Sequence, residues 1–272
     1  MSNILLLFNN VSENYVARIT ESASAVVRGS KHKFVAINLH NSDTSVAQLL
    51  QTHDPSGVIL TPPLSDDRAV LSILEDRQTP FVRIAAMLDL ERGCSVNMDE
   101  LSASIAITKL LVDAGHNRIG FVRGPKEHLV SIRRYNGYAG ALGWARIPVD
   151  GGLVVNGDFS RRSGAEQAAA LFREKPTAIF ASNDDMALGV IDAARSHGVS
   201  IPQELSIVGF DDSTEAARAT PPLTTIRQPL GKMGERAAEL VLERCDGGVR
   251  RNVVEEVPFE LIERESVAAP AG

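Results

Sequence analysis

Short apolar runs of strand length alternate with helical patterns along most of this chain. The runs occupy residues 4–8, 34–39, 58–60, 81–84, 119–122, 153–155, 178–180 and 207–210. Between them, apolar residues recur at helical spacing, as they do at Val16, Ile19, Ala23 and Val26. Strands and helices in alternation form βαβ units with right-handed crossovers between parallel strands. The pattern therefore predicts an α/β fold with mainly parallel, doubly wound sheets.

The composition is that of an ordinary globular chain, with 44% hydrophobic and 23% charged residues among 272. Because single cores tend to split beyond about 250 residues, the length allows one large domain or two smaller ones. The net charge of −6, from 28 Lys and Arg against 34 Asp and Glu, does not favour binding to a phosphate backbone. No apolar run reaches membrane-spanning length, and the start MSNILLLFNN lacks the features of a signal peptide. We therefore expect a cytoplasmic protein with no membrane partner.

Motifs for catalysis and cofactor binding are absent from the sequence. It contains no G-x-G-x-x-G, Walker A loop, H-E-x-x-H or C-x-x-C, and its two cysteines have no metal-ligand spacing. None of the six histidines is tied to a Ser or Cys motif. We expect a protein that is not an enzyme and that has neither a cofactor nor a metal site.

The segment IFASNDDMALGV, residues 179–190, changes from apolar to polar and back to apolar. Its first part is typical of a buried strand, and its second part has helical spacing, so the polar residues lie at a strand-to-helix junction. Asn and Asp are preferred helix N-caps, and we interpret Asp184 as the cap. In a parallel sheet this junction lies at the carboxyl end of a strand, where open α/β folds bind ligands. Asn183 is therefore a candidate ligand contact, with capping as the alternative.

Other predicted strands also end in polar or unusual residues. Arg83 lies in or near the end of one strand, Phe159 follows another, and Asp211 follows a third. Their common placement at carboxyl ends favours a shared pocket over a series of unrelated turns. For Arg83 and Arg134 the sequence leaves three partners open: a ligand carboxylate or phosphate, sugar hydroxyls, or a neighbouring Asp.

A long, ordered set of segments resembles the lac repressor family of bacterial transcription regulators. The segments are DAGHNRIGFVRGP, RRYNGYAGAL, NGDFSRRSG, FASNDDMALG, GVSIPQELSIVGFDD and TPPLTTIRQPLGKMGERAAELVLE, which together span most of residues 113–243. The first hundred residues match the family mainly in pattern.

The resemblance implies a periplasmic-binding-protein-like core, with two α/β subdomains and an effector in the cleft between them. By analogy, the amino-terminal subdomain comprises residues 1–100 and 230–257, and the carboxyl-terminal subdomain comprises residues 101–229 and 258–272. The implied function is the effector-sensing part of a repressor that responds to a sugar or sugar derivative.

The resemblance also implies a set of effector contacts. Asn183, Asp211, Arg134, Phe159 and Gln228 lie at positions that match the family's motifs. Carboxylates, amides and arginine forks suit a polyhydroxylated ligand, because each presents fixed acceptors or donors to hydroxyl groups. Phe159 is either an apolar face for a sugar ring or an aromatic anchor for its loop. Tyr15 takes the aromatic role in a first loop, NNVSENYV, that departs from the family's Asn-Pro-aromatic pattern.

Family members begin with a helix-turn-helix headpiece, whereas the first predicted strand here starts at Ile4. The resemblance therefore implies an effector-binding core that contacts operator DNA only through a headpiece absent from this sequence. It also implies a homodimer, since two-fold operators require two-fold symmetry. The alternative is a periplasmic sugar-binding protein of a transport system, which shares the fold.

Overall fold

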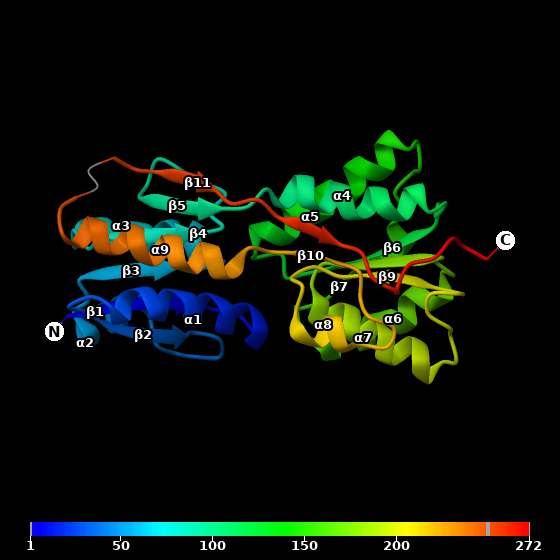
Figure 1. Cartoon of the computed structure of the whole chain (residues 1–272), viewed down its shortest axis with the longest axis horizontal. Helices are drawn as coiled ribbons and strands as arrows, with labels where there is room; N and C mark the ends of the chain where they lie inside the picture. Colours follow the sequence, from blue (N-terminus) through cyan, green and yellow to red (C-terminus); the bar gives the residue numbers. More distant parts are fainter. Residues whose placement is uncertain (1, 249–250, 272) are drawn as a thin grey trace. The chain divides into compact units, whose positions relative to one another are not determined.

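The strands that the sequence predicts are present in the computed structural model, which describes residues 2–248 and 251–271 (Figure 1). The strands are β1 (Asn3–Phe8), β2 (Lys33–Asn38), β3 (Gly57–Leu60), β4 (Phe81–Ile84), β5 (Cys94–Asn97), β6 (Ile119–Arg123), β7 (Val154–Asn156), β8 (Ala178–Ala181), β9 (Ser206–Val208), β10 (Thr225–Arg227), β11 (Val254–Glu256) and β12 (Glu260–Ile262). The α-helices are α1 (Glu13–Arg28), α2 (Val46–His53), α3 (Arg68–Asp76), α4 (Glu100–Asp113), α5 (Leu129–Trp144), α6 (Arg161–Arg173), α7 (Asp184–Ser196), α8 (Thr214–Arg218) and α9 (Leu230–Cys245). Short 3₁₀ turns, η1 (Leu64–Asp66) and η2 (Gly151–Leu153), complete the described elements.

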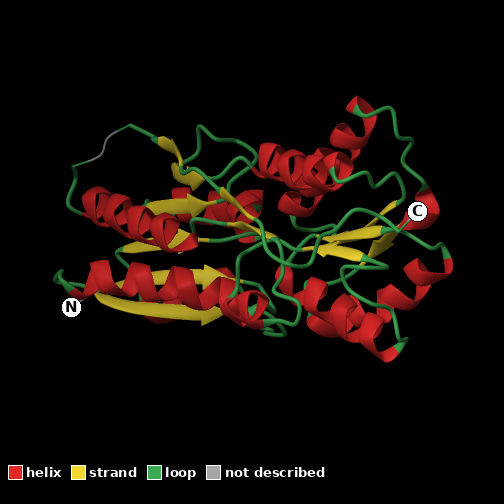
Figure 2. Ribbon diagram, turned by 45° about the vertical axis from the view of Figure 1, so that its right-hand side comes forward, coloured by secondary structure: helices red, strands yellow, loops and turns green. Residues whose placement is uncertain are grey.

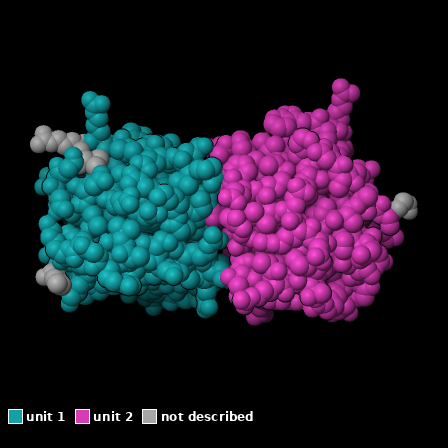
Figure 3. Space-filling view, viewed as in Figure 1, with its two compact units in different colours: residues 1–98, 229–258 teal, residues 99–228, 259–272 magenta. Residues whose placement is uncertain are grey.

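The chain divides into two compact units, which Figure 3 shows in different colours. Unit 1 comprises residues 1–98 and 229–258, and unit 2 comprises residues 99–228 and 259–272. These bounds lie close to the subdomain division that the resemblance implies. Each unit has its own parallel sheet, so each has the doubly wound α/β architecture predicted from the sequence.

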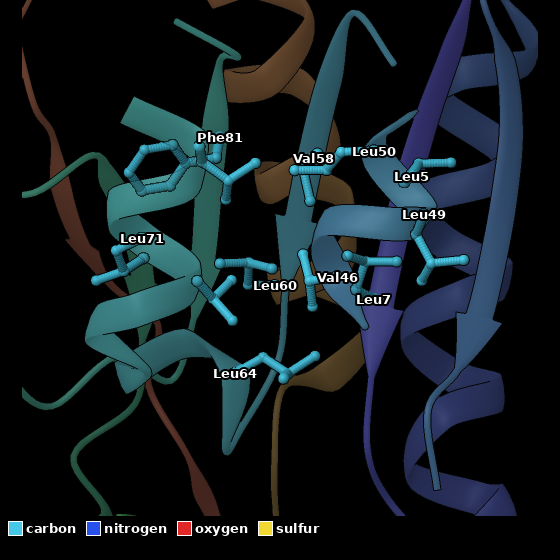
Figure 4. Close-up of a cluster of buried hydrophobic side chains, with 12 residues drawn as sticks. Leu5, Leu7, Val46, Leu49, Leu50, Val58, Leu60, Leu64, Leu71 and Phe81 are labelled. Carbon is cyan, nitrogen blue, oxygen red and sulfur yellow. The ribbon is translucent and has the colours of Figure 1, made fainter. Parts of the chain in front are cut away.

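Unit 1 has a six-stranded parallel sheet in the order β11-β5-β4-β3-β1-β2. Leu5 and Leu7 of β1 pack with Val58 and Leu60 of β3 against helices α2 and α3, and Figure 4 shows this apolar cluster. Helices α1 and α9 pack against each other, and α9 also contacts β3, β4 and β5. Leu5 and Leu7 join this cluster, and Ile4 and Leu6, which alternate with them, are fully buried as well, so residues 4–7 are apolar on both faces of the sheet.

Unit 2 has a four-stranded parallel sheet in the order β7-β6-β8-β9, together with an antiparallel pair, β10-β12. Helix α4 packs against α5, and α6 packs against α7; the ribbon view in Figure 2 shows these helices around the strands. All four strands point the same way, so β6, β7, β8 and β9 end at one edge of the sheet.

Two strands of unit 2 have bounds that differ from the prediction. Strand β7 begins at Val154, because Leu153 ends the 3₁₀ turn η2. Strand β9 ends at Val208 rather than at Phe210, because the next amides turn toward β10: Gly209 donates to the Thr224 carbonyl and Asp211 donates to the Ile226 carbonyl. Asp211 thereby forms an isolated parallel bridge with Arg227 of β10.

None of the helices in the described part of the chain is long and apolar enough to cross a membrane.

Candidate functional site

The residues at the polar junction after β8 have roles that differ from the predicted ones. Asn183, not Asp184, is the N-cap of α7: its Oδ1 accepts a bond of 3.0 Å from the Met186 amide. Its Nδ2 donates to the Phe159 carbonyl at 2.9 Å. Asn183 is therefore both a cap and a tie to the loop after β7, and only 2% of its surface is exposed.

Asp184 is a buried acceptor inside unit 2, which corrects its predicted role as the cap. Its Oδ2 accepts from the Ser213 amide at 2.7 Å, and its Oδ1 accepts from the Thr225 hydroxyl at 2.6 Å. An ideal Cβ on Gly209 would lie 2.3 Å from Oδ1, so only glycine leaves room for this carboxylate. Burial raises the pKa of Asp184 to about 6, against the two donors, which favour ionisation.

Arg134, on α5, forms a buried ion pair with Glu100 at the start of α4. Its Nε donates to Glu100 Oε2 at 2.8 Å and its Nη2 donates to Oε1 at 3.2 Å, while Nη1 donates to the Ser182 carbonyl at 2.6 Å. The guanidinium also stacks on the Phe210 ring, 3.9 Å from its centre. Arg134 and Glu100 are only 4% and 2% exposed, so the pair holds α4, α5 and the end of β8 in fixed positions.

Asp211 has an unusual backbone at the centre of the same region. Its φ of 131° lies in a range that only glycine adopts readily, and the next residue, Asp212, also has a positive φ of 57°. The Asp211 carboxylate accepts a hydrogen bond from Nε2 of Gln228, and both side chains are buried. Burial raises the pKa of Asp211 well above its ordinary value, the Arg134 guanidinium opposes this rise, and the nearby Asp184 carboxylate adds to it.

Phe159 is packed inside its own loop rather than presented to solvent. Its φ is 70°, it is 6% exposed, and its ring meets His128 edge-on with the ring centres 5.3 Å apart. A Cβ on Gly124 would lie 2.2 Å from the ring, so the ring covers the main chain there. Of the two interpretations left open by the sequence, this geometry favours the loop anchor.

His128 is a residue of this region that the sequence reasoning missed. It is the residue before α5, 7% exposed, and burial lowers its pKa to about 4, with the Arg134 charge acting in the same direction. The ring is therefore neutral at physiological pH. Glu100 was missed as well, and it lies 34 positions before its partner.

Arg83 belongs to the other unit of the chain, and its donors are used there. Arg83 lies in β4 of unit 1, has no exposed surface, and uses all five of its N–H groups within that unit. They donate to the carbonyls of Ser65, Leu88, Asp89 and Arg92 and to the carboxylate of Asp66. The sequence prediction of Arg83 as an effector contact is therefore corrected, because no donor is left for a ligand; a neighbouring Asp is its partner among the alternatives left open.

Tyr15 also belongs to unit 1, where it lies in the first turn of α1 and is 8% exposed. Ser12 is the N-cap of this helix, and the Asn10 carboxamide accepts from the Ser12 amide. The first loop thus forms a capped helix start.

Unit 2 therefore gathers Glu100, Arg134, Asn183, Asp184, Asp211 and Gln228 at the carboxyl end of its strands, and we call these residues the polar cluster. It offers carboxylate acceptors and amide and guanidinium donors in a nearly dry setting, where such bonds are strong. No group of three or more metal-ligating side chains occurs among residues 2–248 and 251–271. Acceptors and donors of these kinds suit hydrogen bonds with hydroxyl and amide groups.

Comparison with known proteins identifies the family of this fold. Residues 108–267 match the model of a periplasmic binding protein-like domain. The transcriptional regulator CelR of Thermobifida fusca is 32% identical over 214 residues, which are 77% of this chain and 63% of that protein. The chain belongs to the lac repressor family.

Other members of the lac repressor family show the same likeness. The repressor CytR of Escherichia coli is 36% identical over 65% of this chain and 52% of its own length. A solved CelR–cellobiose complex has a TM-score of 0.90 and 27% identity, and it covers 98% of this chain and 84% of that structure. The chain thus spans about half to two thirds of the length of several curated family members that it matches.

Proposed function

We propose that the polar cluster binds a small effector rich in hydroxyl groups, and that the chain is the ligand-sensing part of a DNA-binding transcriptional regulator. The two units are, in this proposal, the family's two effector-binding subdomains. The observation that carries it is Asp211: a buried carboxylate with a strained backbone and a raised pKa is costly to keep unless ligand donors stabilise its charge.

Four members of the polar cluster have distinct parts in this proposal. Asp211 accepts hydrogen bonds from two ligand hydroxyls, and the Asn183 amide makes a further contact with the ligand. Arg134 and Gln228 orient the Asp211 carboxylate. Phe159 and His128 shape the wall beside Asn183. Tyr15 stays a prediction from the family pattern.

The curated relatives favour regulation over transport or catalysis. CelR and CytR carry the description of HTH-type transcriptional regulators, and the solved CelR complex holds cellobiose. We therefore propose a repressor that responds to a sugar, works in the bacterial cytoplasm and contacts operator DNA through a helix-turn-helix segment. A periplasmic sugar-binding protein is the second candidate, favoured only by the shared fold.

We also propose that the regulator is a homodimer, since an operator with two half-sites matches a protein with two-fold symmetry. Sedimentation should give a dimer; a monomer at tens of micromolar would contradict this part of the proposal.

A thermal-shift screen tests the effector class. The panel contains mono- and disaccharides, sugar acids, and purines and nucleosides as non-sugar competitors. A ligand at a hundred times its dissociation constant stabilises the fold by about 2.7 kcal/mol, which raises the melting temperature by roughly 5–10 °C in a chain of this size. A saturable shift with a sugar, lost in Asp211→Ala, supports the proposal. A shift with purines or nucleosides alone contradicts the sugar assignment.

A further inference from the structure

A separate cavity lies beside the carboxyl end of β6 in unit 2. It has a volume of about 280 Å³ and is lined by Arg123, Gly124, Lys126, Ser131, Ile132, Tyr135, Asn136 and Asn156. None of these residues belongs to the polar cluster. The cavity is therefore a feature that the proposed function leaves unexplained.

The charged group of Arg123 has an unusual setting in this cavity. Its guanidinium carbon lies 3.5 Å from the centre of the Tyr135 ring, which fixes the plane of the fork. Its Nε is buried without a hydrogen-bond partner, and within the described residues the guanidinium has no ion pair. This contrasts with Arg83 and Arg134, whose donors are bonded to carboxylates and carbonyls. A fixed arginine with a buried unused donor is typical of an anion site.

Ser131 supplies a second buried group without a partner. The residue is 3% exposed, it lines the cavity, and its Oγ forms no hydrogen bond with the described residues. An ideal Cβ on Gly124 would lie 2.6 Å from that Oγ, which places the hydroxyl against the bare main chain of the cavity wall. Buried hydroxyls are rarely left unsatisfied, so this group is available to a partner from outside the protein.

The charged side chains of the lining are basic, although the chain carries a net charge of −6 and Lys126 Nζ lies 4.0 Å from the Glu127 carboxylate. Arg123 and Lys126 are the charged residues of the lining, and no carboxylate is among them. Ser131 lies in the first turn of α5, and His128, the residue before that helix, provides no side-chain cap. The positive end of the helix dipole thus adds to the two side-chain charges.

We propose that this cavity binds a phosphate monoester, at a site distinct from the polar cluster. The guanidinium fork, the Ser131 hydroxyl, the Lys126 ammonium and the start of α5 supply donors from several directions, which suits the three terminal oxygens of a phosphate better than the two of a carboxylate. The Tyr135 ring and the Ile132 side chain, which is 45% exposed, form an apolar wall for the organic part of the ester.

The test is calorimetric titration of the chain at constant ionic strength with glycerol 3-phosphate, inorganic phosphate and glycerol. We expect saturable binding of both phosphates, tighter binding of the ester, and none of glycerol. Arg123→Met removes the charge but retains the length of the side chain, and it should weaken binding about tenfold to a hundredfold. Arg123→Lys should recover part of the affinity, because it restores the charge without the fork. Ser131→Ala should weaken binding severalfold.

Two matched variants make the result decisive. Arg162→Met removes the same charge from an exposed position of unit 2 outside the cavity, and it should leave phosphate binding unchanged. Asp211→Ala, in the polar cluster, should also leave it unchanged, so that failure here is distinguishable from failure of the proposed effector site. Equal losses in Arg123→Met and Arg162→Met, loss in Asp211→Ala, binding of inorganic phosphate without the ester, or no saturable binding would each overturn the proposal.

Discussion

Two buried arginines, one in each unit, show how similar sequence signals lead to different roles. Arg83 in unit 1 is bonded to four main-chain carbonyls and one carboxylate, so every donor is used to join β4 to the loops around it. Arg134 in unit 2 is bonded to Glu100 and to one carbonyl, and its charge also acts on Asp211. Both side chains are buried, with 0% and 4% of their surface exposed. Arg83 joins β4 to its neighbouring loops, whereas Arg134 lies among ionisable side chains and acts on their charges.

The largest expected effect comes from removing the scaffold arginine. Arg83→Met removes the donor to four main-chain carbonyls and the ion-pair partner of Asp66, whose carboxylate keeps the Met87 and Leu88 amides. Breaking a buried ion pair from one side costs about 3–5 kcal/mol. Urea unfolding followed by circular dichroism should report this loss of stability.

The matched control for Arg83 is Arg68→Met. Arg68 pairs with Asp89 in the same region, but its side chain is 71% exposed. Exposed pairs contribute about 0–1 kcal/mol, so this variant should be nearly neutral. Similar losses in the two variants would show that Arg83 is not the scaffold group described here.

The buried His128 of unit 2 should make the stability of the fold depend on pH. Because the pKa of His128 falls from 6.5 to about 4 in the folded chain, the unfolded chain takes up this proton first as the pH drops. The neutral His128 ring contributes about 3 kcal/mol to the free energy of unfolding above pH 6.5. This contribution is lost as the pH falls from about 6.5 to 4. His128→Gln should remove this part of the pH dependence.

Asp184 and Asp211 titrate in the opposite sense, because their raised pKa values favour the folded state at low pH. The comparison of wild type with His128→Gln cancels their contribution. His40→Gln, at an exposed histidine of unit 1, is the matched control variant. Equal stability curves for His128→Gln and wild type across this window would contradict the assignment of a buried neutral imidazole.

The smallest stability effect is expected at the helix cap of unit 2. Asn183→Ala removes the acceptor for the Met186 amide and should lower the stability by about 1 kcal/mol. Asn183→Asp keeps the capping oxygen, so thermal unfolding should show a smaller loss. An equal loss in both variants would mean that the bond to the Phe159 carbonyl, and not the cap, is the stabilising contact.

The fold could be predicted because its signal is local. Strand β4 has the predicted bounds, 81–84, and its start is marked by Pro80, which directly precedes the run. Strand β9 was predicted to end two residues too late, because the amides of Gly209 and Asp211 bond with the carbonyls of residues 224 and 226. No local pattern reveals that exchange of partners. The short pair β10-β12 was missed for the same reason, as its strands are three residues long and far apart in the chain.

The polar cluster could be predicted only in part. The strand-end rule pointed to Asn183 and Asp211, which share one edge of the unit 2 sheet. It also pointed to Arg83, because a residue at a strand end looks the same whether its donors meet carbonyls or a ligand. Glu100 carried no signal, since its pairing with Arg134 is long-range. Asp184 was interpreted as a cap because capping is the local role of an Asp at that junction, whereas its partners, Ser213 and Thr225, come from later elements.

The central claim is that Asp211 of the polar cluster binds the effector. Calorimetry of the wild type, Asp211→Ala and Asp211→Asn with the sugar found by screening tests it most directly, with Asp192→Ala as a control at a partly exposed carboxylate of the same unit. Hydrogen bonds to a charged group are worth about 1.5–3 kcal/mol, so Asp211→Ala should weaken binding by roughly tenfold to a hundredfold. Asp211→Asn should lose less, because the amide keeps one acceptor, and Asp192→Ala should lose nothing. Unchanged affinity in both Asp211→Ala and Asn183→Ala would contradict the account.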